Sequence, residues 1–288
     1  MTQRGFIEEI VYILDRYGSL LAKGAGVTML IALTGTVVGL GIGLAVGTVR
    51  SLPRHPPGSG PARRAGLAAV NAVLAVYIEV FRGTPMMVQA MVVYYGLKEG
   101  IGLDLDPIPA GILIVSINTG AYMSEIVRGG IGAVDPGQTE AGQALGMSHW
   151  QIMRGVVLPQ TLRNILPATG NEFVINIKDT SVLNIISVTE LFFQAKSVNG
   201  ITYRAYETFT AVGVIYLVLT FTTTRLLRLL ERHLDGPDNF TLATSSTMPE
   251  SILPAGAAPG AGPPSGAPGA VRPGSTMFPR RPSRWNRR

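Results

Sequence analysis

Cysteine is absent from the 288 residues, which excludes a disulfide framework and thiolate metal sites. His55, His149 and His233 lie far apart and share no ligand spacing, so no metal site is expected. No nucleophile or cofactor constellation is present either, so we predict neither a cofactor nor enzymatic activity. Charged residues make up only 15% of the chain against 47% hydrophobic residues, a composition typical of a membrane protein.

A nucleotide-binding phosphate loop is also missing, because no lysine stands in a G-x-x-x-x-G-K-[ST] sequence. Any ATP hydrolysis must therefore come from a partner. The formal net charge of +6 does not indicate nucleic acid, because the basic residues flank hydrophobic stretches or lie near the C-terminus. The early acidic residues Glu8, Glu9 and Asp15 argue against a cleavable signal peptide.

Long hydrophobic stretches predict an all-α membrane protein with about five transmembrane helices. The predicted spans are residues 24–49, 67–97, 108–127, 161–188 and 206–227, the fourth interrupted at Pro167 and Gly170. Residues 1–23 carry a hydrophobic stripe and are predicted to form an interfacial helix ahead of a transmembrane domain at 24–230. Residues 231–288 are rich in Pro, Gly and Ala and predict a disordered tail.

The charge of the loops predicts the orientation of these spans in the cytoplasmic (inner) membrane. Basic residues follow the first span, namely Arg50, Arg54, Arg63 and Arg64, and the fifth span ends in Arg225, Arg228 and Arg232. The loop after the second span is acidic, with Glu99, Asp104 and Asp106. Cytoplasmic loops carry the excess of arginine and lysine. We therefore expect a multi-pass protein with its N-terminus outside and its C-terminus and tail in the cytoplasm.

Glycines recur at every fourth residue of the first span: Gly35, Gly39, Gly43 and Gly47. Such a small-residue ridge lets a second helix approach closely. The ridge predicts close packing against a helix of the same subunit or of a partner.

The polar segment DPGQTEAGQALGMSHWQIMRGVVLP occupies residues 135–159, between the third and fourth spans. Asp135 and Pro136 suit the start of a helix, and Gln138 is placed to complete a capping box. Gly146 should end this helix and Pro159 should begin the next. A helix of about ten residues is too short to cross a bilayer. It is either a docking element for another protein or an ordinary interfacial helix.

Charged groups within spans cost about 2.5–3.5 kcal/mol each, so they need a reason. In the second span Glu79 and Arg82 are three residues apart and can pair, next to a helix loosened by Gly83 and Pro85. In the third span Glu125 and Arg128 are interpreted as an ion pair that fixes helix packing.

The fourth span carries a polar stripe at helical spacing: Thr169, Glu172, Asn176 and Asp179. A helix facing lipid would not carry such a stripe. It indicates either a polar pathway or a hydrogen-bond network at a subunit interface.

Glu140, Ala141, Gly146, Leu158 and Pro159 resemble the EAA motif of permease subunits of ABC importers, written EAA, three residues, Gly, nine residues, I-x-L-P. The departures are Gly142 for the second Ala and Val156 for the Ile. The resemblance implies the type I importer permease fold and a cytoplasmic coupling helix that fits a groove on the ATPase subunit. The coupling residues would be Glu140, Ala141, Gly142, Leu145 and Gly146.

Four further segments resemble the branch of these permeases that serves histidine, glutamine, glutamate, arginine and opines: FRGTP at 81–85, AYMSEIVRGGI at 121–131, LPQTLRNILPATGNEF at 158–173 and KDTSVLNIISVTEL at 178–191. The resemblance covers residues 24–230 apart from the Pro-rich loop at residues 51–61. It implies two permease subunits (identical or related), two ATP-binding subunits, an extracytoplasmic solute-binding protein and a polar amino-acid substrate.

A zwitterionic amino acid needs a cation for its carboxylate and an anion for its ammonium group. We hypothesise that Arg82 binds the carboxylate, because a guanidinium does so with two parallel hydrogen bonds. Asp179 or Glu172 would bind the ammonium group. Asn176 and Thr180 would orient the ligand, and Thr84 would line the same substrate pathway.

Two other readings compete with an ATP-driven importer. The first is a secondary transporter of amino acids or related zwitterions, driven by an ion gradient with Glu172 and Asp179 as coupling site. It would have no use for the 140–159 segment. The second is a membrane scaffold, which would have no use for a polar stripe within a span.

Overall fold

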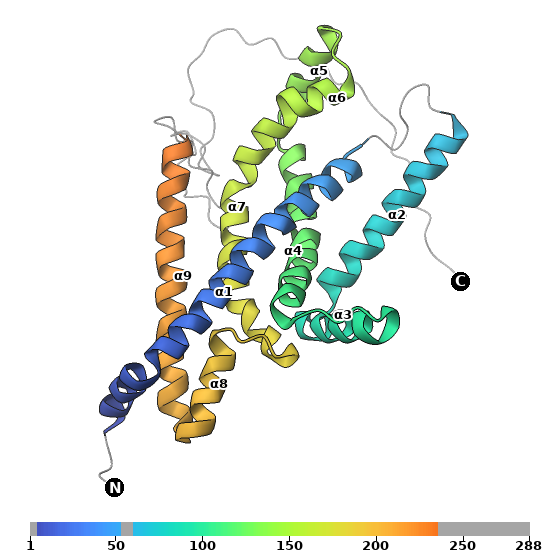
Figure 1. The fold of residues 1–288 in the computed structure, drawn as a ribbon. Helices are drawn as coiled ribbons and strands as arrows, with labels where there is room; N and C mark the ends of the chain where they lie inside the picture. The colour runs from blue at the N-terminus through green and yellow to red at the C-terminus, as the bar shows by residue number, and fades with distance from the viewer. Residues whose placement is uncertain (1–4, 53–59, 236–288) are drawn as a thin grey trace, which may run out of the picture. The chain divides into compact units, whose positions relative to one another are not determined.

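The computed structural model describes residues 5–52 and 60–235, and this part of the chain contains helices and no strands (Figure 1). In chain order the elements are α1 (Phe6–Arg50), α2 (Pro61–Gly83), α3 (Met86–Ile101), α4 (Pro107–Gly132), α5 (Pro136–Ala144), α6 (His149–Ile152), the π-helical turn η1 (Met153–Val157), α7 (Leu158–Asp179), the 3₁₀ segment η2 (Thr180–Ile186), α8 (Leu191–Thr202) and α9 (Ala205–Asp235). Residues 231–235 of the predicted tail belong to α9, which continues because the first residues of that segment extend the helix, and residues 236–288 lie outside the described residues.

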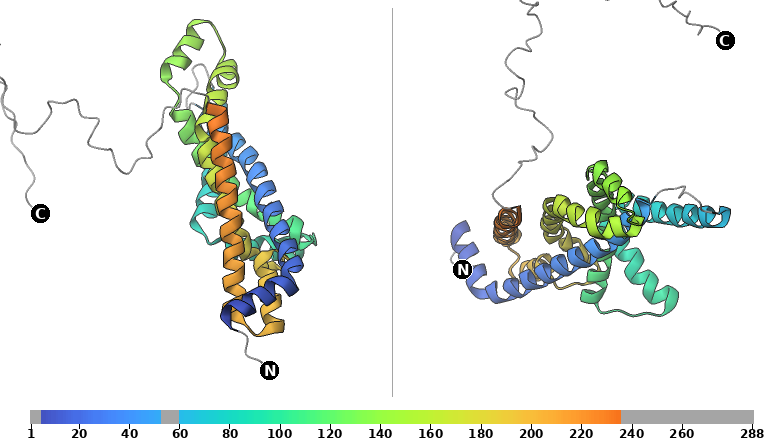
Figure 2. Two further views of the ribbon diagram at one scale, coloured as in Figure 1. Left: turned by 90° about the vertical axis from the view of Figure 1, so that its left-hand side faces the viewer. Right: turned by 90° about the horizontal axis from the view of Figure 1, so that it is seen from above.

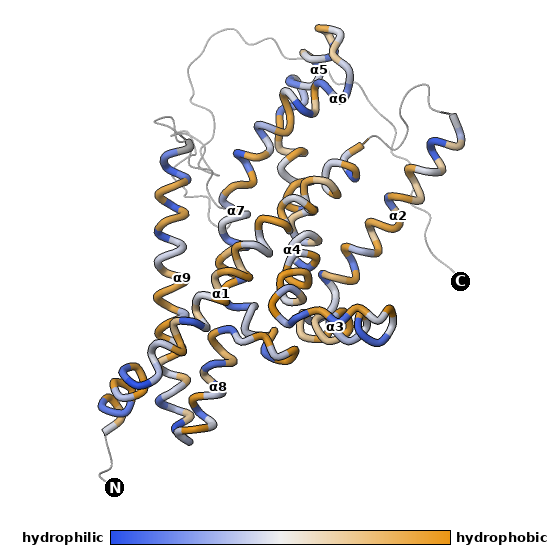
Figure 3. The backbone as a smooth tube through the Cα atoms, in the orientation of Figure 1, coloured by the Kyte–Doolittle hydropathy of each residue, from blue (hydrophilic) through white to orange (hydrophobic). Residues whose placement is uncertain are grey.

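Four of these helices, α1, α2, α4 and α9, are long and hydrophobic enough to cross a membrane. The 22-residue α7 is more polar and packs beside α1 and α4. Figure 2 shows α5 and α6 at one end of the helices and the N-terminal end of α1 at the other. Hydrophilic residues gather at the N-terminal end of α1 and the C-terminal end of α9 (Figure 3). The predicted all-α membrane fold is confirmed.

The glycine ridge of α1 packs against α4 of the same chain. A Cβ atom added at Gly39 would lie 2.7 Å from the Thr119 side chain, and one added at Gly47 would lie 2.8 Å from Val127. Gly43 faces Met123 in the same way. The predicted close packing is therefore confirmed, and its partner is an intramolecular helix.

The sequence predicted an interfacial helix over residues 1–23 that is separate from the first span. The structure does not separate the two. α1 continues without a break from Phe6 to Arg50. No proline interrupts it, and Ile13 and Leu21 are buried against Leu191 and Val212. The contacts with α8 and α9 thus continue α1 toward the N-terminus, where its first turns bend away from the direction of the rest of the helix (Figure 2).

The prediction of one continuous second span over residues 67–97 is wrong. α2 ends at Gly83, and α3 begins at Met86 and runs across the direction of α2 (Figure 1). Thr84 is extended, with φ −121° and ψ 149°. Pro85 accounts for the break, because it lacks an N–H and disfavours helical geometry in the residue before it.

The predicted interruption of the fourth span at Pro167 and Gly170 is also wrong. α7 passes through both residues and ends at Asp179, where η2 begins. A proline within a helix removes one hydrogen bond, and packing can offset that loss. Gly170 faces Leu227 of α9, where an added Cβ would lie 3.3 Å from the leucine side chain.

Candidate functional site: coupling segment and polar pathway

The start of α5 follows from two residues. Asp135 is the N-cap, and its side chain accepts a 2.8 Å hydrogen bond from the Gly137 N–H. Pro136 occupies the first helical position, as predicted. The Gln138 half of the predicted capping box is not formed within the described part of the chain.

Gly146 ends α5 in a Schellman motif. Its φ is +74°, in the left-handed region that glycine adopts without strain. The Gly146 N–H donates to the Gln143 carbonyl over 2.9 Å, and the Met147 N–H donates to the Gly142 carbonyl over 3.0 Å. The predicted role of Gly146 as helix terminator is confirmed.

The sequence predicted that the next helix begins at Pro159. It begins ten residues earlier, at His149. Ser148 caps α6 by accepting from the Gln151 N–H, while the Gln151 side chain accepts from the Ser148 N–H over 2.7 Å. This capping box was readable as S-x-x-Q. α6 then runs through η1 into α7, so Pro159 is the second residue of a helix already begun.

The segment formed by α5, the Gly146 turn and α6 has a core of its own, made by Val134, Ile152, Met153 and Val157. Gly142 belongs to this contact, because a Cβ added there would lie 2.8 Å from Ile152 Cγ1. The close contact gives a reason for glycine in place of the second Ala of the EAA motif.

The outward side of this segment is exposed and partly hydrophobic. Leu145 is 81% exposed and Trp150 is 62% exposed, and Glu140 and Ala141 also face outward. Trp150 was not among the residues predicted from the sequence, although it is a large aromatic residue within a polar segment. Exposed hydrophobic side chains on a segment with its own core are suited to binding a partner protein.

The break between α2 and α3 is closed by two buried amides. The Gln89 amide nitrogen donates to the Phe81 carbonyl over 2.9 Å and to the Thr84 carbonyl over 2.8 Å. Asn118 of α4 donates to the Gln89 side-chain oxygen over 2.8 Å. Backbone carbonyls left open by the break are thereby satisfied, as groups at membrane depth must be. The sequence analysis did not identify this Gln89–Asn118 pair.

Arg82 and Thr84 lie at this break. Arg82 is exposed and its guanidinium lies 5.6 Å from the centre of the Tyr122 ring. The predicted pairing with Glu79 is not formed among the described residues. The Thr84 hydroxyl donates to the Val80 carbonyl over 2.7 Å and accepts from Gln89. Within the described residues, no ion pair joins Arg82 to α7.

Glu125 pairs with Arg128 at 2.7 Å, which confirms the predicted ion pair. Its second oxygen pairs with Arg50 of α1, also at 2.7 Å. Glu125 thus links α1 to α4 where α1 ends. Arg50 stands 75 residues from Glu125 in the sequence.

The polar stripe of α7 divides into inward-bonded and available groups. Asn176 is 3% exposed and donates to Thr36 of α1 over 2.8 Å and to Thr119 of α4 over 3.0 Å. The buried Thr180 hydroxyl donates to the Ile177 carbonyl over 2.9 Å. The Asn176 bonds fix α7 against α1 and α4, whereas the Thr180 bond is local to the junction of α7 and η2.

Two carboxylates remain on α7. Glu172 is only 8% exposed and makes no hydrogen bond or ion pair within residues 5–52 and 60–235. Asp179, at the C-terminal end of α7, is exposed. A carboxylate buried among transmembrane helices without a cation is costly and indicates a functional role.

Comparison with known proteins assigns the class of this structure. A family model described as "Binding-protein-dependent transport system inner membrane component" matches residues 62–236. The glutamine transport system permease protein GlnP of Escherichia coli (strain K12) is 40% identical over 216 residues, which cover 75% of this chain and 93% of GlnP. The arginine transport system permease protein ArtQ of Bacillus subtilis (strain 168) is 31% identical, covering 76% of this chain and 94% of ArtQ.

Solved structures agree. One described as "Crystal structure of an amino acid ABC transporter with histidines" has a TM-score of 0.67 and 35% identity, covering 81% of this chain and all of that one. An inward-facing form of the MetNI methionine ABC transporter shares the fold, with a TM-score of 0.63, 20% identity, and coverage of 76% of this chain and 98% of that one.

The protein is a membrane-spanning transport subunit. It belongs to the family of inner membrane components of binding-protein-dependent transport systems. It is a permease subunit of an ABC importer and not an enzyme, and permeases of this kind work with an ATPase subunit and a binding protein.

Proposed function

We propose that this permease carries polar amino acids into the cell. Relatives that match most of the chain are named for glutamine and arginine transport, and the 35% identical structure is an amino acid transporter. The partners would be an ATP-binding subunit, an extracytoplasmic solute-binding protein and a second permease, identical or related. The chain would lie in the inner membrane with its N-terminus outside and its C-terminus in the cytoplasm.

The coupling segment carries the part of this proposal that concerns the ATP-binding partner. α5 and α6 project at the same end of the helices as the C-terminal end of α9 (Figure 1), with Leu145 and Trp150 exposed. Gly142 packs inward and Gly146 forms the turn, so Glu140, Ala141 and Leu145 are left facing outward. We assign this surface to docking on the ATPase subunit in the cytoplasm.

The substrate pathway is assigned from charge. Arg82, exposed at the α2–α3 break, would bind the substrate carboxylate, and Glu172 or Asp179 would bind the ammonium group. Asn176 is bonded to α1 and α4, which supports an indirect role for it: it would hold α7 in position. Thr180, whose hydroxyl donates only to the nearby Ile177 carbonyl, would orient the ligand.

The coupling assignment is tested by Glu140→Ala in the complex reconstituted with its ATPase and binding protein. We expect ATP hydrolysis stimulated by the binding protein to fall by about tenfold, with normal membrane insertion. Glu99→Ala is the matched control, an exposed acidic residue on α3. Equal stimulation in Glu140→Ala and in Glu99→Ala would contradict docking at α5.

The pathway assignment is tested by Arg82→Ala and Glu172→Gln, with Arg204→Ala as a control at an exposed arginine. Uptake should be lost in the first two variants, while assembly with the ATPase subunit is kept. Unchanged uptake in either variant would remove that residue from the pathway.

A further inference from the structure

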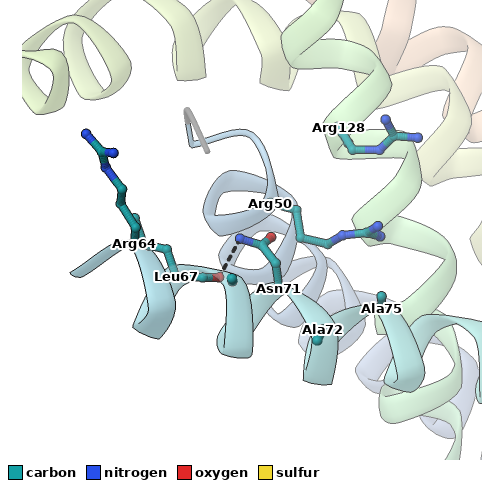
Figure 4. A pocket seen from close by; sticks show the side chains of 8 residues that line it. Arg50, Arg64, Leu67, Asn71, Ala72, Ala75 and Arg128 are labelled. Atoms are coloured by element: carbon teal, nitrogen blue, oxygen red, sulfur yellow. Dashed lines mark hydrogen bonds between the residues drawn. The ribbon is translucent and has the colours of Figure 1, made fainter. Parts of the chain in front are cut away.

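The second helix, α2, is held against α4 near its C-terminal end. A cavity of about 570 Å³ separates its first turns from the ends of α1 and α4, and it is lined by Ala75 on α2 and by Arg50 and Arg128 on the other two helices (Figure 4). Ile78 is the one buried residue of α2, all of which lies in the described part of the chain. The place of Arg82, at the end of α2, is therefore set by side-chain contacts with α4 beyond this cavity.

Two aromatic residues make contacts between α2 and α4 here. The Tyr77 hydroxyl of α2 donates to the Ile117 carbonyl of α4 over 2.6 Å. Five residues further along α2, the guanidinium carbon of Arg82 lies over the ring of Tyr122, 5.6 Å from the ring centre. Tyr122 is 37% exposed, and its hydroxyl makes no hydrogen bond within residues 5–52 and 60–235. The contact between Tyr122 and Arg82 therefore depends on the ring and not on the hydroxyl.

Two carboxylates stand near Arg82, and neither forms an ion pair with it in the described part of the chain. Glu79 precedes Arg82 by one turn of α2 and is exposed. Glu125 lies on α4, and both of its oxygens are taken: one by Arg50 and the other by Arg128, each over 2.7 Å. A guanidinium has five N–H donors, so Arg82 keeps its donors available to a ligand.

An aromatic ring and a carboxylate differ in what they leave to that ligand. A cation over a ring face is attracted by the charge distribution of the ring, and no hydrogen bond is used. A carboxylate would instead occupy two N–H donors of the guanidinium. The ring also restricts a side chain that otherwise has much rotamer freedom. A group that is held in place beforehand loses less freedom when it binds.

We propose that Tyr122 is a positioning residue for the substrate: its ring holds the guanidinium of Arg82 so that the N–H donors meet the carboxylate of the amino acid. This rests on the proposed function, which places Arg82 at the substrate carboxylate. Arg50 and Arg128 contribute indirectly, because they keep Glu125 engaged and away from Arg82. Tyr122 thus takes part in amino-acid recognition by way of Arg82.

The test changes the electron density of the ring while its shape is kept. Tyr122→Phe is made first, and the phenylalanine ring at this position is then replaced by rings with successively more fluorine atoms, which weaken the attraction of the ring face for a cation. The complete complex of permease and ATPase subunits is purified without the binding protein. Binding of L-glutamine and of L-arginine, for whose transport two relatives are named, is measured by calorimetry.

Phe221 of α9 supplies the matched control. Its ring carries Arg225, whose guanidinium carbon lies 4.8 Å from the ring centre. Neither residue belongs to the proposed substrate pathway. The same fluorinated rings at Phe221 show whether weakening any contact between a cation and a ring lowers binding.

We expect Tyr122→Phe to bind the amino acid as the native protein does. The dissociation constant should then rise stepwise along the fluorinated series, to about two- to fivefold, which is the effect of losing a cation–ring contact at a partly exposed site. The Phe221 series should leave it unchanged. A flat Tyr122 series, or an equal rise in both series, would overturn the positioning role. Loss of binding in Tyr122→Phe would also overturn it, because the hydroxyl would then be the group that matters.

Arg82→Ala in the same binding measurement, and ATP-dependent uptake with the binding protein restored, separate this inference from the proposed function. If the native protein takes up and binds an amino acid, Arg82→Ala loses the binding and the Tyr122 series is flat, the positioning role fails and the proposed function stands. Uptake without binding by the native complex, or equal binding in Arg82→Ala, would overturn the positioning role as well. If the native protein takes up neither amino acid, the proposed function fails and the positioning role fails with it.

Discussion

Asn118 of α4 donates to the side-chain oxygen of Gln89 over 2.8 Å, and this bond ties the broken helix α2–α3 to the centre of the protein. Gln89 in turn bonds the Phe81 and Thr84 carbonyls on both sides of Arg82. The position of Arg82 in the proposed pathway therefore depends on a pair of amides that does not itself carry charge.

Asn118→Leu should loosen this break. Losing the bond leaves the buried Gln89 oxygen unsatisfied, which costs about 1–3 kcal/mol. We expect a lower unfolding temperature in lipid nanodiscs and a fall in uptake, since the segment around Arg82 is no longer fixed. Asn164→Leu, at an exposed position of α7, is the control. Native stability and uptake in Asn118→Leu would show that the break is held by other contacts.

Gly39→Ala should destabilise the contact between α1 and α4. The new methyl group would lie 2.7 Å from the Thr119 side chain, and overpacking of this kind costs about 1–3 kcal/mol. Gly41→Ala is a matched control on the same helix, because nothing lies within 4 Å of a Cβ atom there. Thermal unfolding of both variants decides the point, and equal unfolding temperatures would contradict the packing assignment.

Gly146→Ala should weaken coupling through the backbone. At φ +74° an alanine is strained by about 1–2 kcal/mol, so the turn between α5 and α6 should shift or fray. ATP hydrolysis stimulated by the binding protein is the measurement, and we expect a several-fold fall. Gly155→Ala in η1, where φ is not positive and the space is open, should keep native stimulation. Loss of stimulation in Gly155→Ala alone would contradict this account.

Glu190 should make stability depend on pH. It is fully buried, and burial raises the pKa of its carboxyl, while hydrogen bonds from the Phe192 and Phe193 N–H groups and the Tyr216 hydroxyl act in the opposite direction. The pKa of Glu190 in the folded protein exceeds its value of about 4.3 in the unfolded chain. The contribution of the protonated Glu190 carboxyl to the free energy of unfolding is therefore fully present below that unfolded value and is lost as pH rises through the folded pKa.

The unfolding temperature of the native protein should therefore fall as pH rises through that window, and the fall should be smaller in Glu190→Gln, which cannot ionise. Glu99→Gln controls for the loss of an exposed carboxylate. The same pH dependence in the native protein and in Glu190→Gln would assign the effect to another group.

The elements that could be predicted from the sequence are those fixed by local chemistry. The four-residue period of Gly39 and its neighbours gave the close packing of α1, and Asp135, Pro136 and Gly146 gave both ends of α5. Ser148 and Gln151 carried an equally local signal that the sequence analysis overlooked.

The remaining features depend on contacts between distant residues. Asn118 and Gln89 are 29 residues apart, and no local pattern joins them. The continuity of α7 through Pro167 and the inward bonds of Asn176 to Thr36 depend on how α1 and α9 pack around that helix. A polar stripe shows which face of a helix is polar, but not whether its groups bond within the chain or to a ligand.

The central claim, that the α5 turn docks on an ATPase subunit in the cytoplasm, is tested most directly by accessibility. Because the chain has no native cysteine, Gln143→Cys places a single thiol on the exposed surface of α5. A membrane-impermeant maleimide should label this variant in inside-out vesicles and not in right-side-out vesicles, and bound ATPase subunit should slow the labelling. Labelling from the outer side only, or labelling that the ATPase subunit leaves unchanged, would contradict the account.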